Sequence, residues 1–283
     1  MAFILACLSL LCAIGNDLIY HRRSHGSAQR AGQHLLLVAV VWTVIFVPPA
    51  LLMGHCGYSA VVWGTISGIA GIGAHLLLLS ALRTGDLGTC STIYRLNLVP
   101  AAIIAIALFG EQLTPIKALA IAIAAGAVAL LAKGTKAQTP QVFRLAVYAC
   151  LLRAGMALSY KQGLIAGAEA IDLLAINGIA WCIGALMWMY YTRPVLATVQ
   201  QHTAESWIAL GWGLASGVLV SGNVLFLMLA LAQGQLSTVL PITQLSFVAT
   251  AAIACALGNE SAAPRRITGI ACAALSVILL ALT

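Results

Sequence analysis

A small group of polar residues lies inside a strongly apolar stretch of this sequence, and one of them is a cation. Arg95 stands in the middle of the apolar run 86–109, with Tyr94 and Asn97 close by. Ionisable residues within apolar runs are costly unless they face a cavity or a partner. The planar fork of arginine suits bidentate binding of a carboxylate. The pattern predicts that Arg95 binds an anionic group, and a structural ion pair with an acid on a neighbouring helix is the alternative.

A second polar group stands at matching positions later in the chain. Thr243, Gln244 and Ser246 follow Tyr94, Arg95 and Asn97 at an offset of 149 residues. If the two stretches are related by symmetry, both groups face one cavity, so we predict a binding site to which both contribute. Other polar or aromatic residues inside apolar runs are further candidates for its wall: Arg153, Tyr160, His75 and Trp181, with Asn177 and Asn223 as weaker ones.

One acidic residue is a candidate for proton coupling. Asp17 lies near the end of the apolar run 3–20, where a carboxylate could gain and lose a proton during transport across a membrane. It could equally be an interfacial charge, because Arg22 and Arg23 follow closely. His75 also has a structural alternative, since it is a single histidine in an apolar run.

Two glutamates stand where apolar runs end and are predicted to be structural. Glu111 and Glu260 are expected to cap the next helix or to pair with Lys117 and Arg265, because an acid stabilises the first turn of a helix. Lys161 is expected to extend its ammonium group to the membrane surface.

The motifs of several other function classes are missing from the sequence. There is no phosphate-binding P-loop, no HExxH and no GxSxG pattern, and the eight cysteines form no CxxC pair. His21 and His25 are spaced by four residues but have no further candidate metal ligands nearby. We therefore predict no ATPase, no enzyme, no metal or cofactor, and no nucleic-acid partner.

The composition predicts an all-α membrane protein. Of the 283 residues, 62% are hydrophobic and 7% are charged, with a mean hydropathy of +1.02. So few charges cannot cover a water-exposed surface, and in lipid every backbone group needs an internal partner, which favours helices in runs of about 20 residues. Ten such runs are expected to cross the bilayer: 3–20, 34–53, 58–82, 86–109, 115–132, 142–163, 171–191, 206–231, 235–257 and 264–282.

The second half of the chain repeats the first. At the same offset, Trp63-Gly64, Ser67-Gly68 and Pro115 match Trp212-Gly213, Ser216-Gly217 and Pro264. We therefore predict two five-helix repeats, 1–137 and 138–283. An odd number of spans turns the second copy upside down, which is the plan of transporters that alternate access to a site between their halves. The spacings Gly64-x-x-x-Gly68 and Gly213-x-x-x-Gly217 predict close helix packing.

These motifs resemble the EamA-type family of the drug/metabolite transporter superfamily. The resemblance rests on Ala81-Leu82 to Pro100 followed by Phe109-Gly110-Glu111, and on the second copy, Ala230-Leu231 to Thr250 followed by Gly258-Asn259-Glu260. Ala249 replaces the proline and Asn259 the glycine in that copy. The resemblance implies ten helices around a central cavity, a bacterial inner membrane, and export of small metabolites, amino acids or drugs.

The orientation of the chain in the membrane and its function class each have alternative predictions. Lysine and arginine gather in the loops after the odd-numbered runs, which by the positive-inside rule places both termini outside the cytoplasm, whereas the resemblance implies cytoplasmic termini. A secondary exporter is the main prediction. A flippase for a lipid-linked carrier and an intramembrane enzyme are the alternatives. The substrate, the coupling ion and the oligomeric state stay undetermined.

Overall fold

The computed structural model describes residues 1–23, 28–54, 56–82, 90, 93–132, 140–192, 203–246 and 264–281, and its elements there are all helices. Six of them are long and apolar enough to cross a membrane: α1 (Ala2–Arg23), α2 (Ala28–Met53), α3 (Tyr58–Leu82), α7 (Pro140–Ile165), α8 (Ala170–Tyr191) and α9 (Thr203–Gln233). These six spans fit a multi-pass integral membrane protein.

Four shorter helices complete the described part of the chain: α5 (Leu98–Phe109), α6 (Pro115–Ala132), α10 (Leu236–Gln244) and α12 (Pro264–Ala281). Proline opens α6, α7 and α12, at a position where its missing N–H leaves no helical bond unmade. Gly110 ends α5 in the left-handed conformation, with φ of 63°, which glycine adopts without steric cost.

Two of the predicted spans are interrupted at equivalent places. Where the sequence predicts one run over 86–109, helix ends at Arg95, turns at Leu96 and Asn97, and restarts as α5. Pro100 has no N–H to bond the carbonyl of Leu96, which explains this break. In the second copy α10 ends at Gln244 and turns at Leu245, again at the 149-residue offset, and 247–257 lie outside the described residues.

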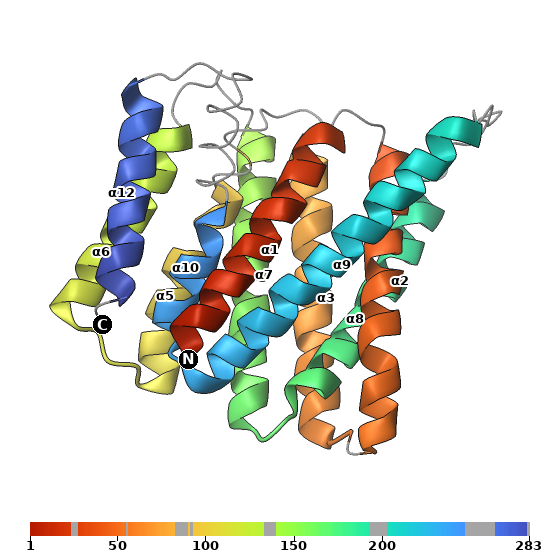
Figure 1. Cartoon of the computed structure of the whole chain (residues 1–283), viewed down its shortest axis with the longest axis horizontal. Helices are drawn as coiled ribbons and strands as arrows, with labels where there is room; N and C mark the ends of the chain where they lie inside the picture. Colours follow the sequence, from red (N-terminus) through yellow and green to blue (C-terminus); the bar gives the residue numbers. More distant parts are fainter. Residues whose placement is uncertain are drawn as a thin grey trace.

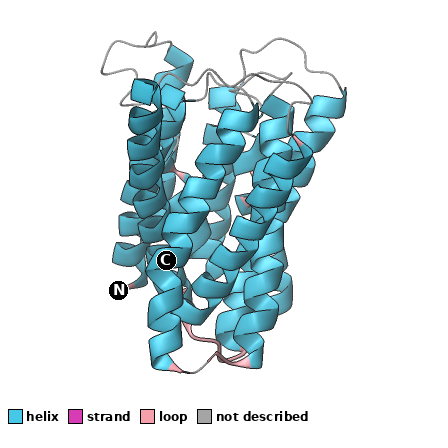
Figure 2. Cartoon of the chain, turned by 90° about the vertical axis from the view of Figure 1, so that its right-hand side faces the viewer, coloured by secondary structure: helices cyan, strands magenta, loops and turns pink. Residues whose placement is uncertain are grey.

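The helices run up and down between two ends of a bundle (Figure 1). The short described loops between α2 and α3, α5 and α6, α7 and α8, and α9 and α10 all lie at the lower end, where α1 begins and α12 finishes. Figure 2, turned by 90°, again shows the helices standing upright, with described loops at the lower end. In Figure 1, α1 runs upward from the lower end, whereas α7 runs downward to it, so these two helices are antiparallel.

Most of the extensive helix contacts join one half of the sequence to the other. α3 packs against α7 and α8, and α9 packs against α1 and α2. α2 also packs against α8, α6 against α12, and α5 against α10. In terms of the predicted repeat, the contacts of α3 with α7 and α8 correspond to those of α9 with α1 and α2.

The glycine pairs of α3 and α9 lie where these helices approach their neighbours. A Cβ atom added at Gly68 would stand 2.5 Å from the Cβ of Ala180 in α8. A Cβ atom added at Gly217 would stand 2.6 Å from the Cβ of Val41 in α2. The two pairs thus serve equivalent contacts in the two halves, and both contacts need glycine for close approach.

Candidate functional site

Three residues from distant parts of the chain form a polar cluster beside the two helix interruptions. Arg95 Nη2 donates to Asp17 Oδ2 at 2.6 Å, and Arg95 Nη1 donates to Ser246 Oγ at 2.8 Å. The Ser246 hydroxyl in turn donates to Asp17 Oδ2 at 3.0 Å. We call these three residues the Asp17–Arg95–Ser246 cluster. It joins α1, the turn of helix before α5 and the end of α10.

The Asp17–Arg95–Ser246 cluster is partly buried. The side chains of Arg95 and Asp17 keep 17% and 21% of their accessible surface. Arg95 thus forms the ion pair with an acid on another helix that was the alternative to binding an external anion. The pair also joins Arg95, the predicted anion-binding residue, to Asp17, the predicted proton carrier. The two predicted roles therefore concern one site.

A group of aromatic residues and a histidine begins next to the cluster, at Tyr94. Tyr94 is buried, and its hydroxyl lies 3.4 Å from Nδ1 of His75, which also contacts the carbonyl of Gly71 at 3.1 Å. The ring of His75 meets the ring of Trp181 edge-on, with centroids 4.6 Å apart. The ring of Trp181 also contacts that of Trp42, with centroids 5.6 Å apart. The structure thus places His75, Tyr94 and Trp181 together, and the contacts of His75 are those of a packed side chain.

Arg153 is the second cation inside the bundle. Its guanidinium carbon lies 6.0 Å from the centre of the Tyr94 ring, within the range of a cation–π interaction. Nη1 also lies 3.4 Å from the sulfur of Met156. Within the described part of the chain, Arg153 forms no ion pair, so its positive charge is not neutralised there.

Two other predicted site residues of these stretches, Asn97 and Thr243, hydrogen-bond to the backbone. Asn97 is fully buried and donates to the carbonyl of Tyr94 at 2.8 Å, which supports the helix interruption. The hydroxyl of Thr243 donates to the carbonyl of Leu240 at 2.9 Å. Gln244 is buried beside it. The side chains of Asn97 and Thr243 therefore hold the backbone on either side of the cluster residues Arg95 and Ser246.

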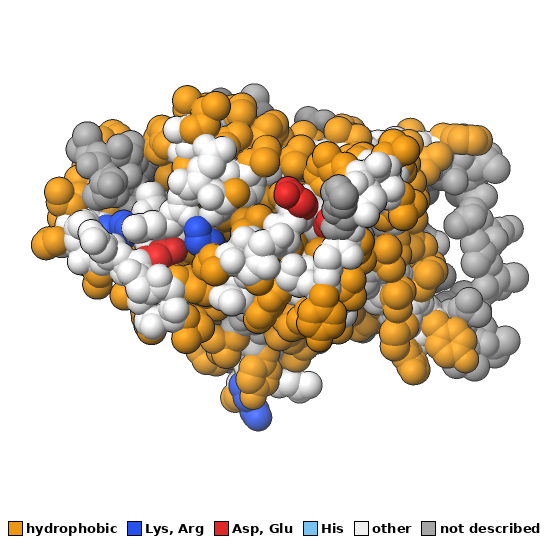
Figure 3. Space-filling view, turned by 90° about the horizontal axis from the view of Figure 1, so that it is seen from below, with side chains coloured by type: hydrophobic (Ala, Val, Ile, Leu, Met, Phe, Trp, Pro, Cys, Tyr) orange, Lys and Arg blue, Asp and Glu red, His pale blue; other side chains and the backbone are white. Residues whose placement is uncertain are grey.

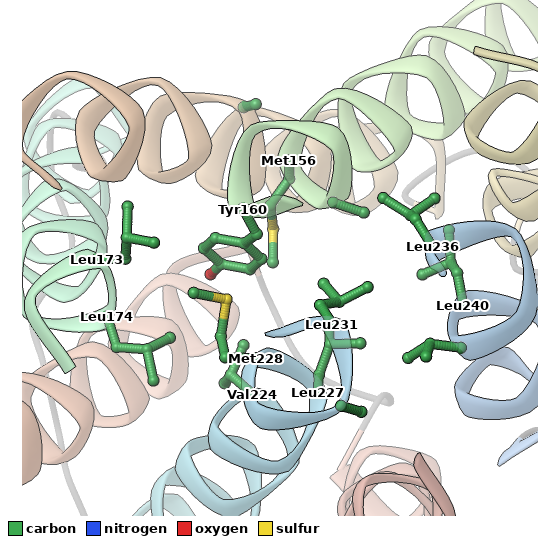
Figure 4. Close-up of a cluster of buried hydrophobic side chains, with 14 of the residues drawn as sticks. Met156, Tyr160, Leu173, Leu174, Val224, Leu227, Met228, Leu231, Leu236 and Leu240 are labelled. Atoms are coloured by element: carbon green, nitrogen blue, oxygen red, sulfur yellow. The ribbon is translucent and has the colours of Figure 1, made fainter. Parts of the chain in front are cut away.

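Tyr160 lies in the apolar core. It is fully buried, and Figure 4 shows its ring among Met156, Met228 and Leu174. Among the described residues its hydroxyl has no hydrogen-bond partner, whereas Asn177 in the same core donates to the hydroxyl of Ser67 at 2.8 Å. The structure does not place Tyr160 in the Asp17–Arg95–Ser246 cluster.

The expectation that Glu111 caps the following helix is wrong. Its two carboxylate oxygens accept from the backbone N–H groups of Leu236 and Ser237, at 2.6 and 2.8 Å. They cap α10, which is distant in sequence. Spacing could not reveal this partner, because α10 comes close only when the two halves pack. Glu260 lies outside the described residues.

Two lysines at the same end also hold the α9–α10 connection. Lys161 is partly exposed, and its Nζ donates to the carbonyls of Leu231 and Gly234 at 2.8 and 2.7 Å. Lys117 hydrogen-bonds to the side chain of Gln235. Seen from below, this end presents mainly hydrophobic and uncharged polar side chains, with charged groups in only a few places (Figure 3).

A cavity of about 350 Å³ opens at this lower end. It is lined by the start of α1, residues from the α5–α6 loop such as Gln112, and the first turns of α10. None of the predicted site residues lines it, so we assign it no part in the site. Among the described residues, no group of three or more histidines, cysteines and acids could hold a metal ion.

The comparisons with known proteins identify the fold only. No family model and no curated protein matches the chain. A solved structure, described only as the crystal structure of a protein, matches with a TM-score of 0.79 and 14% identity. The match covers 99% of this chain and 96% of the other, so the whole arrangement of helices is one that another protein shares.

Proposed function

We propose that this chain is a secondary transporter that moves a small organic metabolite, amino-acid-like or anionic, by alternating access. Its ten spans would form two inverted five-helix repeats, 1–137 and 138–283, around a central site. The proposal agrees with the resemblance to the EamA-type family, which also suggests export across a bacterial inner membrane. It assigns no catalytic residue to the chain.

The helix arrangement supports the inverted repeats. Matching long helices run in opposite directions, and the contacts of α3 with α7 and α8 correspond to those of α9 with α1 and α2. The two interruptions, at Leu96–Asn97 and at Leu245, occupy equivalent positions. Interrupted helices in corresponding positions of two halves commonly mark the substrate site of a transporter.

One observation carries the proposal: the Asp17–Arg95–Ser246 cluster sits at these interruptions and is built from both halves. Charged groups inside a membrane protein are retained at a cost and commonly mark a pathway. Arg153, which lies against the ring of Tyr94, forms no ion pair among the described residues. A cation without an acidic partner next to the cluster favours a solute with an anionic group.

Reconstitution in liposomes tests the proposal against its alternatives. A thermal-shift screen of amino acids, organic acids and phosphate esters on the purified protein identifies candidate solutes, and counterflow of the hits then measures exchange. Selective counterflow supports the transporter. Scrambling of labelled lipids without solute exchange would instead favour the flippase, and conversion of a solute to a product would favour the enzyme.

The variant Arg95→Gln is the specific test of the site. Loss of one charge-assisted hydrogen-bond partner costs about 1.5–3 kcal/mol, or roughly 10- to 150-fold in affinity for an anionic solute. Arg144→Gln is the matched control, because Arg144 is an exposed arginine whose Nε contacts only the carbonyl of Pro140 at 3.4 Å among its described contacts. Equal counterflow in the two variants would remove Arg95 from the site.

A further inference from the structure

The geometry of Arg95 differs from that of an arginine holding a carboxylate with both ends of its fork. Its two terminal nitrogens go to different residues, Nη2 to Asp17 and Nη1 to Ser246. Asp17 receives both of its described bonds on one oxygen, Oδ2. A carboxylate ligand that engages Nη1 and Nη2 in parallel would form a stronger pair. It would have to replace Asp17 on Nη2 and Ser246 on Nη1.

We propose that a carboxylate substrate displaces Asp17 from Arg95, and that the displaced Asp17 takes up a proton, so that the substrate and one proton cross the membrane together. This inference rests on the transport function proposed above and names its substrate class and coupling ion. It makes the Asp17–Arg95–Ser246 cluster an exchange point between an internal and an external carboxylate.

The physical reason is the cost of a lone charge. Asp17 is four-fifths covered, and a carboxylate that loses its cation in such a place is strongly destabilised unless it becomes neutral. A proton from the aqueous phase forms an O–H bond on Asp17 as the contact with Arg95 breaks. When the substrate leaves, the proton returns to water and the Asp17–Arg95 contact re-forms. Charge is balanced at each step.

Among the described residues, Asp17 is the carboxylate that contacts Arg95 and Ser246. α10 contains no ionisable residue, and neither does α9 from Trp207 to its end. Besides Arg95, the titratable or charged groups that interact with this region are Tyr94, Arg153 of α7, Cys150 of α7 and His75 of α3. In the absence of substrate the Asp17 carboxylate has the Arg95 guanidinium as its counter-charge, and in the proposal the arrival of a second anion removes it.

Proteoliposomes with a pH-sensitive dye inside provide the test. The probes are L-glutamate, L-phenylalanine and L-malate, whose carboxyl groups are largely ionised between pH 6.0 and 8.5. We expect counterflow of at least one probe to rise as the pH falls, by at most about tenfold per pH unit for a single proton. Net uptake of that probe should acidify the lumen by about one proton per molecule.

Three variants separate coupling from folding. Asp17→Asn, which mimics the protonated state, should make counterflow insensitive to pH and abolish lumen acidification, whereas Asp17→Glu should keep both. Glu169→Gln, an exposed acid at the start of α8, should behave as the natural protein. Thermal unfolding of each purified variant checks that it is folded.

Each result decides between the two proposals. Counterflow without proton movement in the natural protein, or proton movement that survives Asp17→Asn, would overturn the coupling and leave the transporter standing. Counterflow of other solutes from the screen, with none of the three probes exchanged, would overturn the carboxylate specificity. If no solute exchanged at all, the transport function itself would fail.

Discussion

Single side chains hold this bundle together across long stretches of sequence. Glu111 stabilises the start of α10, and Lys161 stabilises the end of α9, so that an acid meets free N–H groups and a base meets free carbonyls. Both arrangements match the sign of the helix dipole at each end. The connection at Gly234-Gln235 is therefore fixed by charged groups from α7 and from the α5–α6 loop.

Removing the carboxylate of Glu111 should destabilise the protein. Glu111→Ala leaves two buried N–H groups without their acceptor, which costs about 1–2 kcal/mol. We expect a lower temperature of thermal unfolding in detergent. Glu169→Ala is the matched control: Glu169 stands at the start of α8, but its side chain makes no capping bond. If both variants unfolded at the same temperature, the cap of α10 would contribute nothing.

At the level of helices, close packing depends on the absence of side chains at two equivalent contacts. Gly68 brings α3 against α8, and Gly217 brings α9 against α2. Without a water-driven hydrophobic effect between helices in lipid, such close packing is a main source of their association. The same contacts are natural sliding surfaces if the halves rock against each other.

Gly217→Ala should therefore disturb the bundle although alanine favours helices. The added Cβ would stand 2.6 Å from Cβ of Val41, an atom attached directly to the backbone, so the two helices must separate. Overpacking of this kind costs about 1–3 kcal/mol. At Gly126, no described atom lies within 4 Å of an added Cβ. Gly126→Ala should unfold at the natural temperature or above, and a matching loss of stability there would contradict the packing argument.

At the level of the whole molecule, the proposed inverted repeats predict which loops share a side of the membrane. Cys56, Gln112 and Glu169 belong to the loops at the lower end, whereas Thr192 caps the opposite end of α8. Labelling with a membrane-impermeant thiol reagent should modify Cys56, Gln112→Cys and Glu169→Cys from one side. Thr192→Cys should react from the other side.

This labelling also resolves the orientation that loop charge and family resemblance predict differently, because both termini lie at the lower end (Figure 1). Reaction in intact cells places the lower end outside, and reaction only in inverted vesicles places it in the cytoplasm. Reaction of Cys56 and Gln112→Cys from opposite sides would contradict five spans per repeat. A cysteine-free background with single cysteines restored keeps the readout specific.

The sequence alone determined where the long helices lie, but not the interruptions at Leu96–Asn97 and Leu245. The runs predicted over 58–82 and 115–132 are the ranges of α3 and α6, and the other long helices differ by a few residues. A span depends on the hydropathy and length of one local stretch, so its position needs no knowledge of the rest. The internal offset also indicated that Arg95 and Ser246 belong to corresponding regions of the two copies.

Only the tertiary structure decided which partners these residues have. Asp17 and Arg95 are 78 positions apart, and Arg95 and Ser246 are 151 apart, so no local pattern relates them. Glu111 and Lys161 likewise find their partners in α10 and at the end of α9. Tyr160 lies in the apolar core, because burial depends on which helices surround a residue. A hydrogen bond acts over about 3 Å, and packing of the halves alone sets distances on that scale.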